Sequence, residues 1–269
     1  MTSPSTPTLP LSAALADIVR RASAAPRMLV LLDFDGTLAP FQDQPEAAII
    51  AEPARDLLRR LAENPRVTVG IVSGRSIADL AERVAIEGVV YAGNHGIEIR
   101  GHGLHFIEPV AFLLEPALKK LVDELTLRVE EIPNVRIENK HLTATMNLRG
   151  VRREDGVRAS EILSALVEEL PQFLIQPAKE AFDIVPRNGW NKGSAVQWIR
   201  NALAMNEALT IFAGDDVSDE DAFAVLTGAI TIKVGEPPTA AAHLASSPSE
   251  IWALLTELET ALEIPSHQQ

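Results

Sequence analysis

Four short apolar runs stand in the first and last parts of the chain, at residues 28–32, 67–72, 89–92 and 209–213. An unbroken apolar run of this length is typical of a parallel strand that is buried on both faces. Helical patterns lie between and after these runs, at residues 53–64, 77–84, 192–204 and 220–226. Because strands alternate with helices, the pattern predicts an α/β domain with a mainly parallel sheet.

Each predicted strand leads directly into polar residues or glycine. The first two runs end at Asp33 and Ser73, and the other two continue into Gly93-Asn94-His95-Gly96 and Gly214-Asp215-Asp216. In an open parallel sheet, ligands bind beyond the carboxyl ends of the strands. The pattern therefore predicts a functional site at that edge of the sheet.

The middle of the chain has a different pattern. Helical patterns cover residues 116–131 and 154–170, and strand-like stretches cover residues 135–138, 142–148, 173–175 and 181–185. These helices and paired strands lack the polar clusters at strand ends, which favours a smaller α+β domain inserted into the larger one. We predict a core formed by residues 1–104 and 188–269, and an inserted domain formed by residues 105–187.

The composition excludes several classes of protein. Of 269 residues, 46% are hydrophobic and 23% are charged, as in folded globular proteins. No apolar run approaches the length of about 18 residues that a membrane-spanning helix needs. The chain contains no cysteine, so disulfides and thiolate chemistry are excluded. Its formal net charge of −13 makes nucleic acid and an anionic membrane surface poor partners.

Further expectations concern the ends of the chain and its setting. Residues 3–7 do not form a basic region that leads into an apolar run, which argues against a secretory signal and predicts a floppy leader. We expect the tail after Glu263 to be frayed. The lack of cysteine fits a reducing cytoplasm, and we expect the protein to be a monomer there.

The sequence Asp33-Phe34-Asp35-Gly36-Thr37 follows the first buried strand. Side chains two positions apart in an extended chain point the same way, so both carboxylates are predicted to face one pocket. Gly36 permits a sharp turn directly afterwards. Two carboxylates this close repel each other unless a cation or a shared proton relieves the repulsion.

Three further segments carry candidate chemistry. The segment Gly214-Asp215-Asp216-Val217-Ser218-Asp219-Glu220 is rich in carboxylates, the ligands that suit Mg²⁺. Asp219 could equally cap the helix that follows. Ser73 and Gly74 stand where a hydroxyl and backbone N–H groups can hold a phosphate. Lys192 opens a helical pattern and could supply a positive charge to phosphate, although lysines are more often solvated surface residues.

The motifs DFDGT, SGR, Lys192 and GDDVSDED, in this order, resemble those of haloacid dehalogenase superfamily phosphatases. Within that superfamily the chain resembles the trehalose-6-phosphate phosphatase family over roughly residues 28–235. Residues 93–98 resemble the family's HG segment, and Glu138 with Lys140 resembles its E-x-K segment. Lys179, Asp183 and Pro186 resemble its later K-x-x-x-E-x-x-P segment.

This resemblance implies a Rossmann-like core with a C2B-type cap domain, and hydrolysis of trehalose 6-phosphate through an aspartyl-phosphate. Asp33 is the implied nucleophile, and Asp35 the implied proton donor and acceptor. Mg²⁺ is the implied cofactor, and its implied ligands or their neighbours are Asp33, Asp35 through its backbone carbonyl, Asp215, Asp216 and Asp219. The implied phosphate-binding residues are Ser73, Gly74 and Lys192.

The resemblance also implies a set of residues that bind the substrate, a small sugar phosphate. They are Arg75, Asn94, His95, Gly96, Glu138, Lys140, Arg149, Lys179 and Asp183. The chain departs from the family where Asn147 and Leu148 replace His and Tyr, and where Val185 replaces Arg. These positions lie in the predicted cap, which in this family contacts the sugar, so the resemblance does not decide which sugar the substrate carries.

Three alternatives to trehalose 6-phosphate hydrolysis follow. The same reaction could act on another sugar phosphate or on a glycosyl-glycerate phosphate. The chain could resemble phosphomannomutases, which share the opening motif and a similar cap and need a bisphosphorylated activator. A sugar-phosphate-binding module without turnover is a third alternative, although Asp33, Asp35, Lys192 and Asp215 all carry the residue types that turnover requires.

Overall fold

The computed structural model describes residues 8–42 and 47–263. The chain divides into a larger unit, Met1–His105 with Asn191–Gln269, and a smaller unit, Phe106–Trp190. The assignment of these units as catalytic core and cap stays a prediction. The floppy leader over residues 3–7 and the frayed tail after Glu263 lie outside the described residues.

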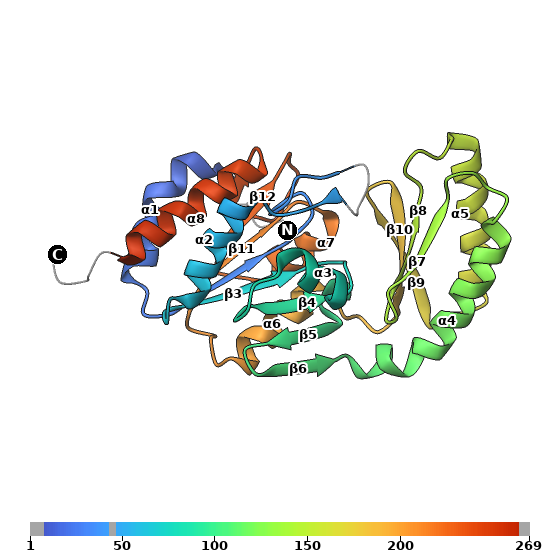
Figure 1. Cartoon of the computed structure of the whole chain (residues 1–269), viewed down its shortest axis with the longest axis horizontal. Coiled ribbons are helices and arrows are strands. Elements are labelled where there is room, and N and C mark those ends of the chain that lie inside the picture. Colours follow the sequence, from blue (N-terminus) through green and yellow to red (C-terminus); the bar gives the residue numbers. More distant parts are fainter. Residues whose placement is uncertain (1–7, 43–46, 264–269) are drawn as a thin grey trace, which may run out of the picture. The chain divides into compact units, whose positions relative to one another are not determined.

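The larger unit contains a nine-stranded sheet with the strand order β1-β13-β12-β11-β2-β3-β4-β5-β6 (Figure 1). In this order, each strand from β1 through β13, β12, β11, β2 and β3 to β4 runs parallel to its neighbour, and β5 pairs with β4 antiparallel. The mainly parallel sheet that the apolar runs predict is therefore confirmed. The strands are β1 (Leu9–Pro10), β2 (Met28–Leu32), β3 (Val67–Val72), β4 (Val90–Gly93), β5 (Glu98–Gly101), β6 (Leu104–Ile107), β11 (Leu209–Gly214), β12 (Ile230–Val234) and β13 (His243–Ala245).

Helices cover both faces of this sheet. The helices are α1 (Leu11–Ala24), α2 (Glu52–Glu63), α3 (Ile77–Val84), α6 (Lys192–Ala202), α7 (Val217–Val225) and α8 (Pro248–Glu263), and a 3₁₀ turn, η2 (Asn94–Gly96), follows β4. On β11, Ile211 belongs to the core shared with α1, α2, α3 and α8. Its neighbour Phe212 points to the opposite face and packs edge-on against Phe223 of α7, with the ring centroids 5.5 Å apart.

The smaller unit contains a four-stranded antiparallel sheet in the order β7-β8-β10-β9 (Figure 1). Its elements are α4 (Pro109–Val129), β7 (Arg136–Asn139), β8 (Ala144–Asn147), α5 (Arg153–Glu168), β9 (Phe173–Ala178) and β10 (Ala181–Pro186). Met146 and Ile184 are buried against residues of α4 and α5. Thr145 and Asp183 alternate with them and therefore face away from the helices.

The start of α4 differs from the sequence pattern. The helix expected from Pro116 begins at Pro109, where the Glu108 carboxylate accepts a hydrogen bond of 2.7 Å from the backbone N–H of Ala111. A side-chain cap thus fixes the start, and Pro116 lies inside the helix. Although α4 has 21 residues, neither it nor any other helix of the described part is apolar enough to cross a membrane.

Candidate active site

A tight turn carries the chain away from β2 directly after Asp33. The backbone N–H of Asp33 donates to the carbonyl of Ala213 on β11 (2.9 Å), so this residue still belongs to the sheet edge. The N–H groups of Leu38 and Ala39 then both donate to the carbonyl of Phe34, and the N–H of Gly36 donates to Ala39 (2.7 Å). These bonds close a compact loop over residues 34–39 that begins at the carboxylate of Asp33.

Gly36 allows this turn to approach the carboxylate of Asp215. Its backbone has φ +77°, which glycine adopts without strain, and an added Cβ would lie 2.0 Å from Asp215 Oδ2. No side chain fits in that space. The glycine in the DFDGT motif therefore serves the position of a carboxylate more than 170 residues away in the chain.

We expect Gly36→Ala to disrupt the acidic site, and Gly103→Ala to leave it intact. Both glycines have nearly the same backbone (φ +77° and +76°), and nothing lies within 4 Å of an added Cβ at Gly103. Each substitution should cost about 1–2 kcal/mol for the left-handed backbone. Only Gly36→Ala should also displace Asp215 and lower turnover, by about 100-fold. Equal turnover of the two folded variants would contradict this explanation.

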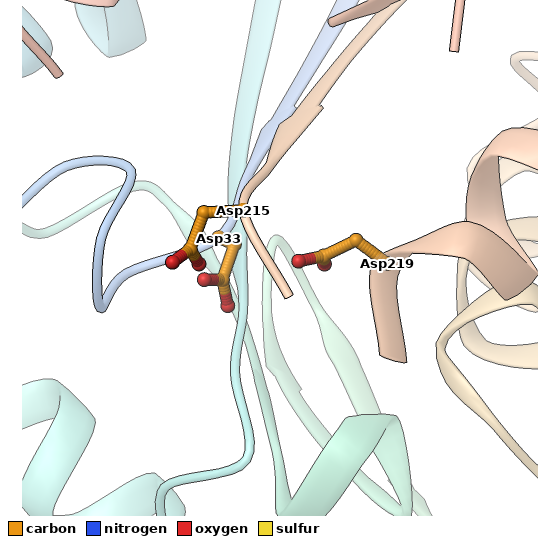
Figure 2. A group of neighbouring side chains, drawn as sticks. All are labelled: Asp33, Asp215 and Asp219. Carbon is orange, nitrogen blue, oxygen red and sulfur yellow. The ribbon is translucent and has the colours of Figure 1, made fainter. Parts of the chain in front are cut away.

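Three carboxylates meet at the edge of the sheet: Asp33 after β2, Asp215 after β11 and Asp219 in the first turn of α7. One oxygen of each lies within 4.8 Å of the other two. Figure 2 shows Asp33 and Asp215 close together, with Asp219 pointing toward them from α7. The close approach of Asp219 depends on Gly214, where an added Cβ would lie 2.2 Å from the Asp219 Cγ.

One buried lysine contacts this group of carboxylates. Lys192, the first residue of α6, is 2% exposed, and its Nζ donates to Asp33 Oδ1 (2.8 Å) and to Asp219 Oδ1 (2.7 Å). Three carboxylates and one ammonium leave a formal charge of −2 in a site where Asp33 and Asp219 are buried and Asp215 is half-buried. A divalent cation would neutralise that charge, and carboxylate oxygens are the ligands that Mg²⁺ prefers.

The site holds its carboxylates at a cost in free energy. Burial raises the pKa of Asp33 well above its ordinary value, and the charges of Asp219 and Asp215 add to this against the opposing charge of Lys192. Burial also raises the pKa of Asp215 to about 7, and the charge of Asp219 contributes. Both shifts show that, without a cation, these groups favour a proton, and a bound cation would relieve the same strain.

The pKa of Asp215 predicts that the stability of the metal-free protein falls as pH rises. A carboxyl group whose pKa is about 7 in the folded protein and about 3.9 when unfolded stabilises the fold fully only below the lower value. This contribution is lost as pH rises through 7, by an amount on the order of a few kcal/mol. In EDTA, the melting temperature should therefore fall between about pH 5 and about pH 8.

The control for this prediction is Asp215→Asn, which cannot titrate. Its melting temperature in EDTA should depend less on pH than that of the wild type over the same range. Saturating Mg²⁺ should flatten the wild-type curve, because the ion replaces the proton on Asp215. An identical pH dependence for wild type and variant in EDTA would contradict the assignment to this carboxylate.

Asp216 lies next to the three carboxylates but has a different structural role. Its side chain accepts from the backbone N–H of Val217, and the Asp219 carboxylate accepts from the N–H of Asp216 (2.9 Å). The two residues form a capping box at the start of α7. Asp219 thus caps the helix with one oxygen and contacts Lys192 with the other, and its role as a metal ligand stays a prediction.

The carboxylate of Asp35 does not join the three. It accepts from Nε (2.6 Å) and Nη2 (2.7 Å) of Arg75, which is a bidentate ion pair. Arg75 also donates to Asp79 (2.6 Å) and lies over the ring of Phe34, 5.3 Å from its centroid. Arg75 therefore has two anchors of its own, and it holds both oxygens of Asp35.

The loop after β3 is fastened to the turn η2. Ser73 is 2% exposed, and its carbonyl accepts from the N–H of His95 (2.9 Å). The carbonyl of Arg75 accepts from the N–H of Asn94 (2.7 Å), and an added Cβ on Gly74 would lie 2.7 Å from the His95 ring. Among the residues predicted to bind substrate, Asn94 and His95 thus support the loop that presents Ser73.

A second polar group lies on the smaller unit. Glu138, Thr145, Asp183 and Gln176 are register partners across β7, β8, β10 and β9, and so form one row on the sheet face away from the helices. The hydroxyl of Thr145 donates to Asp183, and the Lys140 Nζ lies 3.9 Å from the same carboxylate. Lys140 and Asp183 are buried, and Glu138 is exposed.

The remaining predicted residues of the smaller unit lie near the ends of its strands. Lys179 is exposed between β9 and β10, and Arg149 follows β8, where its N–H donates to the side chain of Asn147 (2.9 Å). Leu148 packs against the core of the smaller unit. Val185 is buried, two positions from Asp183 on the same face of the sheet.

Sequence reasoning missed three polar residues that the structure makes prominent. Lys233 is buried in β12 and contacts the backbone of Asp215 and Asp216, Asp79 binds Arg75, and Thr145 binds Asp183. Lys233 left a signal, since it is a lone lysine in the apolar stretch Ile230–Val234. Asp79 also left a signal, since it stands four positions after Arg75, whereas the role of Thr145 depends on a contact that no sequence spacing indicates.

Comparison with known proteins gives consistent relatives. The family model of the trehalose-phosphatases matches residues 31–249. The chain is 30% identical over 260 residues to a trehalose 6-phosphate phosphatase of Zea mays, and this match covers 88% of this chain and 71% of the relative. It is 34% identical over 250 residues to a trehalose-phosphate phosphatase of Mycobacterium marinum, which covers 88% of this chain and 63% of the relative. The chain thus spans less than two thirds of the mycobacterial relative.

Solved structures agree with the sequence relatives. A crystal structure described as a trehalose-6-phosphate phosphatase related protein is 26% identical, with a TM-score of 0.77 over 86% of this chain and 97% of that chain. The predicted fold of haloacid dehalogenase phosphatases, with a mainly parallel sheet, is thereby confirmed. The chain therefore belongs to the trehalose-phosphatase family.

Proposed function

We propose that the protein is a Mg²⁺-dependent phosphatase that hydrolyses trehalose 6-phosphate through an aspartyl-phosphate on Asp33. The observation that carries the proposal is the buried group of Asp33, Asp215 and Asp219 with Lys192 in contact. The names of the relatives from Zea mays and Mycobacterium marinum support the choice of substrate.

The residues present fit a magnesium ion. The raised pKa values of Asp33 and Asp215 mark a site with excess negative charge, and the three carboxylates offer oxygens near one another. Asp33, Asp215 and Asp219 would hold the ion, with the backbone carbonyl of Asp35 as the further ligand that the family resemblance implies. When bound, Mg²⁺ would polarise the phosphoryl group and offset the charge that builds on its oxygens.

The first half of the proposed reaction transfers the phosphoryl group to the enzyme. A carboxylate oxygen of Asp33 attacks phosphorus, and the bond between phosphorus and the sugar oxygen breaks while Asp35 gives that oxygen a proton. Lys192 would neutralise the charge of the phosphoryl oxygens. Ser73 lies in the loop that the turn η2 supports, and its hydroxyl would donate a hydrogen bond to the same oxygens. Such a covalent intermediate splits one difficult step into two easier ones.

The second half returns Asp33 to its starting state. A water oxygen attacks phosphorus, the bond from phosphorus to the Asp33 oxygen breaks, and Asp35 takes the proton from that water. Because Asp35 gives a proton to the sugar oxygen in the first half and takes one from water in the second, its carboxyl group must have an oxygen free to carry that proton. In the structure Arg75 holds both of its oxygens, so Asp35 must leave at least one of these bonds before it can give a proton.

We expect Asp35→Asn to lower turnover by about 10²–10⁴-fold, the usual contribution of a general acid and base. The substitution keeps the side chain's shape, and its backbone carbonyl can still serve the ion. Mg²⁺ affinity, measured by calorimetry, should therefore change little. Turnover within tenfold of the wild type would remove Asp35 from this role.

The polar row of the smaller unit is our candidate for sugar recognition. Thr145, Lys140 and Asp183 form one buried hydrogen-bonded and charged group, and Glu138 extends the row at its exposed end. Hydroxyl groups of a sugar need donors and acceptors of this kind, held in fixed positions. Val185 lies on the same face and offers no hydrogen bond where the family often has Arg, so another sugar phosphate or a glycosyl-glycerate phosphate stays the alternative substrate.

A panel of phosphate esters tests the proposal directly. Phosphate release should be fastest with trehalose 6-phosphate, compared with glucose 6-phosphate, sucrose 6-phosphate and glucosyl-glycerate phosphate, and should stop in EDTA. Faster release from another ester would change the substrate and keep the reaction. Conversion of mannose 1-phosphate to mannose 6-phosphate only after addition of a sugar bisphosphate would favour a mutase. Binding of these esters without phosphate release, with Mg²⁺ present, would leave only a binding module.

A further inference from the structure

Lys233 is a buried lysine that the proposed reaction does not use. It lies in β12, whose other residues are all buried and apolar or hydroxyl-bearing, and it is 8% exposed. A lysine is seldom buried to this degree unless its ammonium group is paired. Its register partner on β11 is Gly214, the residue directly before Asp215.

Within the described part of the chain, the Lys233 ammonium contacts the segment that joins β11 to α7 and the first turn of α7. It donates to the backbone carbonyl of Asp215 (2.5 Å) and to that of Asp216 (3.3 Å), and lies 3.8 Å from Glu220 Oε1. The other oxygen of Glu220 accepts from the backbone N–H of Ala240 (2.7 Å). The lysine therefore ties two successive peptide carbonyls of one turn to the neighbouring strand.

The side chains of the turn bind its N–H groups in a complementary way. Asp219 accepts from the N–H of Asp216, and Asp216 accepts from the N–H of Val217. Lys233 binds the carbonyls of the same stretch. The backbone at and directly after Asp215 is therefore held through its N–H groups as well as through its carbonyls.

The two buried lysines near the site differ in what they bind. Lys192 donates to carboxylate oxygens of Asp33 and Asp219, which are oxygens that a cation would also use. Lys233 donates to backbone carbonyls and leaves the carboxylate oxygens of Asp215 to other partners. Its contacts can therefore persist unchanged when a cation binds.

We infer that Lys233 is a positioning residue that holds the peptide carbonyls of Asp215 and Asp216, so that the Asp215 carboxylate faces Asp33 before a cation binds. The inference rests on the proposed function, because it assumes that this group of carboxylates binds Mg²⁺. Residues that orient a metal ligand commonly contribute about 10–100-fold to metal affinity. Lys233 would act through the backbone and would touch neither the ion nor the substrate.

The test compares Lys233→Met with Lys119→Met in the substrate-free protein. Methionine keeps most of the length of the side chain and removes the charge and the donors. Lys119 lies on the surface of α4 and serves as the matched control. Calorimetric titration with MgCl₂ should give a dissociation constant at least about tenfold higher for Lys233→Met than for wild type, and no change for Lys119→Met.

Kinetics provide a readout that a purely structural role would not change in this way. At saturating Mg²⁺, Lys233→Met should recover most of the wild-type kcat with KM unchanged, because high metal concentration compensates for weak metal binding. At low Mg²⁺ its kcat should fall. If Lys233→Met does not fold, Lys233→Gln, which keeps a shorter donor, should show the same weakening in the same titration.

The outcomes separate this inference from the proposed function. A dissociation constant within twofold of wild type in a folded Lys233 variant would overturn the role of the lysine and leave the phosphatase untouched. A variant that binds Mg²⁺ normally and has a lower kcat at every Mg²⁺ concentration would overturn it as well. Wild-type protein that binds no Mg²⁺ under any condition would overturn the proposed function and this inference together.

Discussion

Asp33→Asn should abolish phosphate release, with a loss in kcat of about 10⁴-fold or more. The amide cannot form the acyl-phosphate bond, and Asp219 cannot replace it, because its two oxygens already accept hydrogen bonds from Lys192 and from the backbone N–H of Asp216. The fold should persist, since Asn keeps an oxygen for Lys192. The metal-free variant should melt at the same temperature as the wild type or higher, because one of three repelling carboxylates is gone.

Phosphate release from trehalose 6-phosphate, normalised to folded protein, measures the loss. Mass spectrometry after rapid acid quench should detect a phosphorylated wild-type chain and none for the variant. Asp33→Ala controls for deamidation of the new Asn, and Asp56→Asn, on the surface of α2, controls for a change of Asp to Asn as such. Activity within tenfold of wild type in both Asp33 variants would falsify the assignment of the nucleophile.

Most of the buried strands of the large sheet could be predicted from the sequence, and its edge strands could not. The buried strand β12, which Lys233 interrupts, was missed. Strands β2, β3 and β11 are almost fully buried, so their apolar runs are unbroken and easy to recognise. Strands β1 and β6 lie at the two edges of the sheet, where side chains are exposed or half-buried and the pattern fades. No apolar run marks such strands, because their positions depend on a neighbouring strand.

The two terminal helices, α1 and α8, could have been found and were missed. In α8, Ile251, Leu254, Leu255 and Leu258 are buried at helical spacing, which is a pattern visible in the sequence. The start of α4 is different, because the decisive contact is the side-chain cap formed by Glu108. Nothing in the apolar pattern indicates which polar residue forms a cap.

In the candidate site, too, some features could be predicted from the sequence and others could not. Asp33, Asp215 and Lys192 stand at strand ends or a helix start, so the topology of a parallel sheet predicts that they gather. The direction of each side chain is not predictable in that way. Whether Asp216 or Asp219 points inward depends on which of them forms the N-cap, and the pairing of Asp35 with Arg75 depends on two loops that are 40 residues apart.

The last prediction concerns the charge balance of the site. Lys192 and its two partners are almost completely buried, with side-chain exposures of 2% for Lys192, 6% for Asp33 and 0% for Asp219. Removal of one partner from a buried ion pair leaves an uncompensated charge, which typically costs about 3–5 kcal/mol. Burial of a charged lysine is itself unfavourable, yet the two carboxylates raise the pKa of Lys192 and keep it protonated.

Lys192→Met should therefore lower the free energy of unfolding by about 3–5 kcal/mol in EDTA near pH 8. Near pH 5 the loss should be smaller, because Asp33 and Asp215 already have raised pKa values and a proton can replace the missing ammonium. Urea denaturation at both pH values measures the difference. Lys119→Met, at an exposed ion pair, should cost less than about 1 kcal/mol at either pH. An equal loss at both pH values, or a loss as small as that of Lys119→Met, would show that Lys192 does not neutralise the carboxylates of this site.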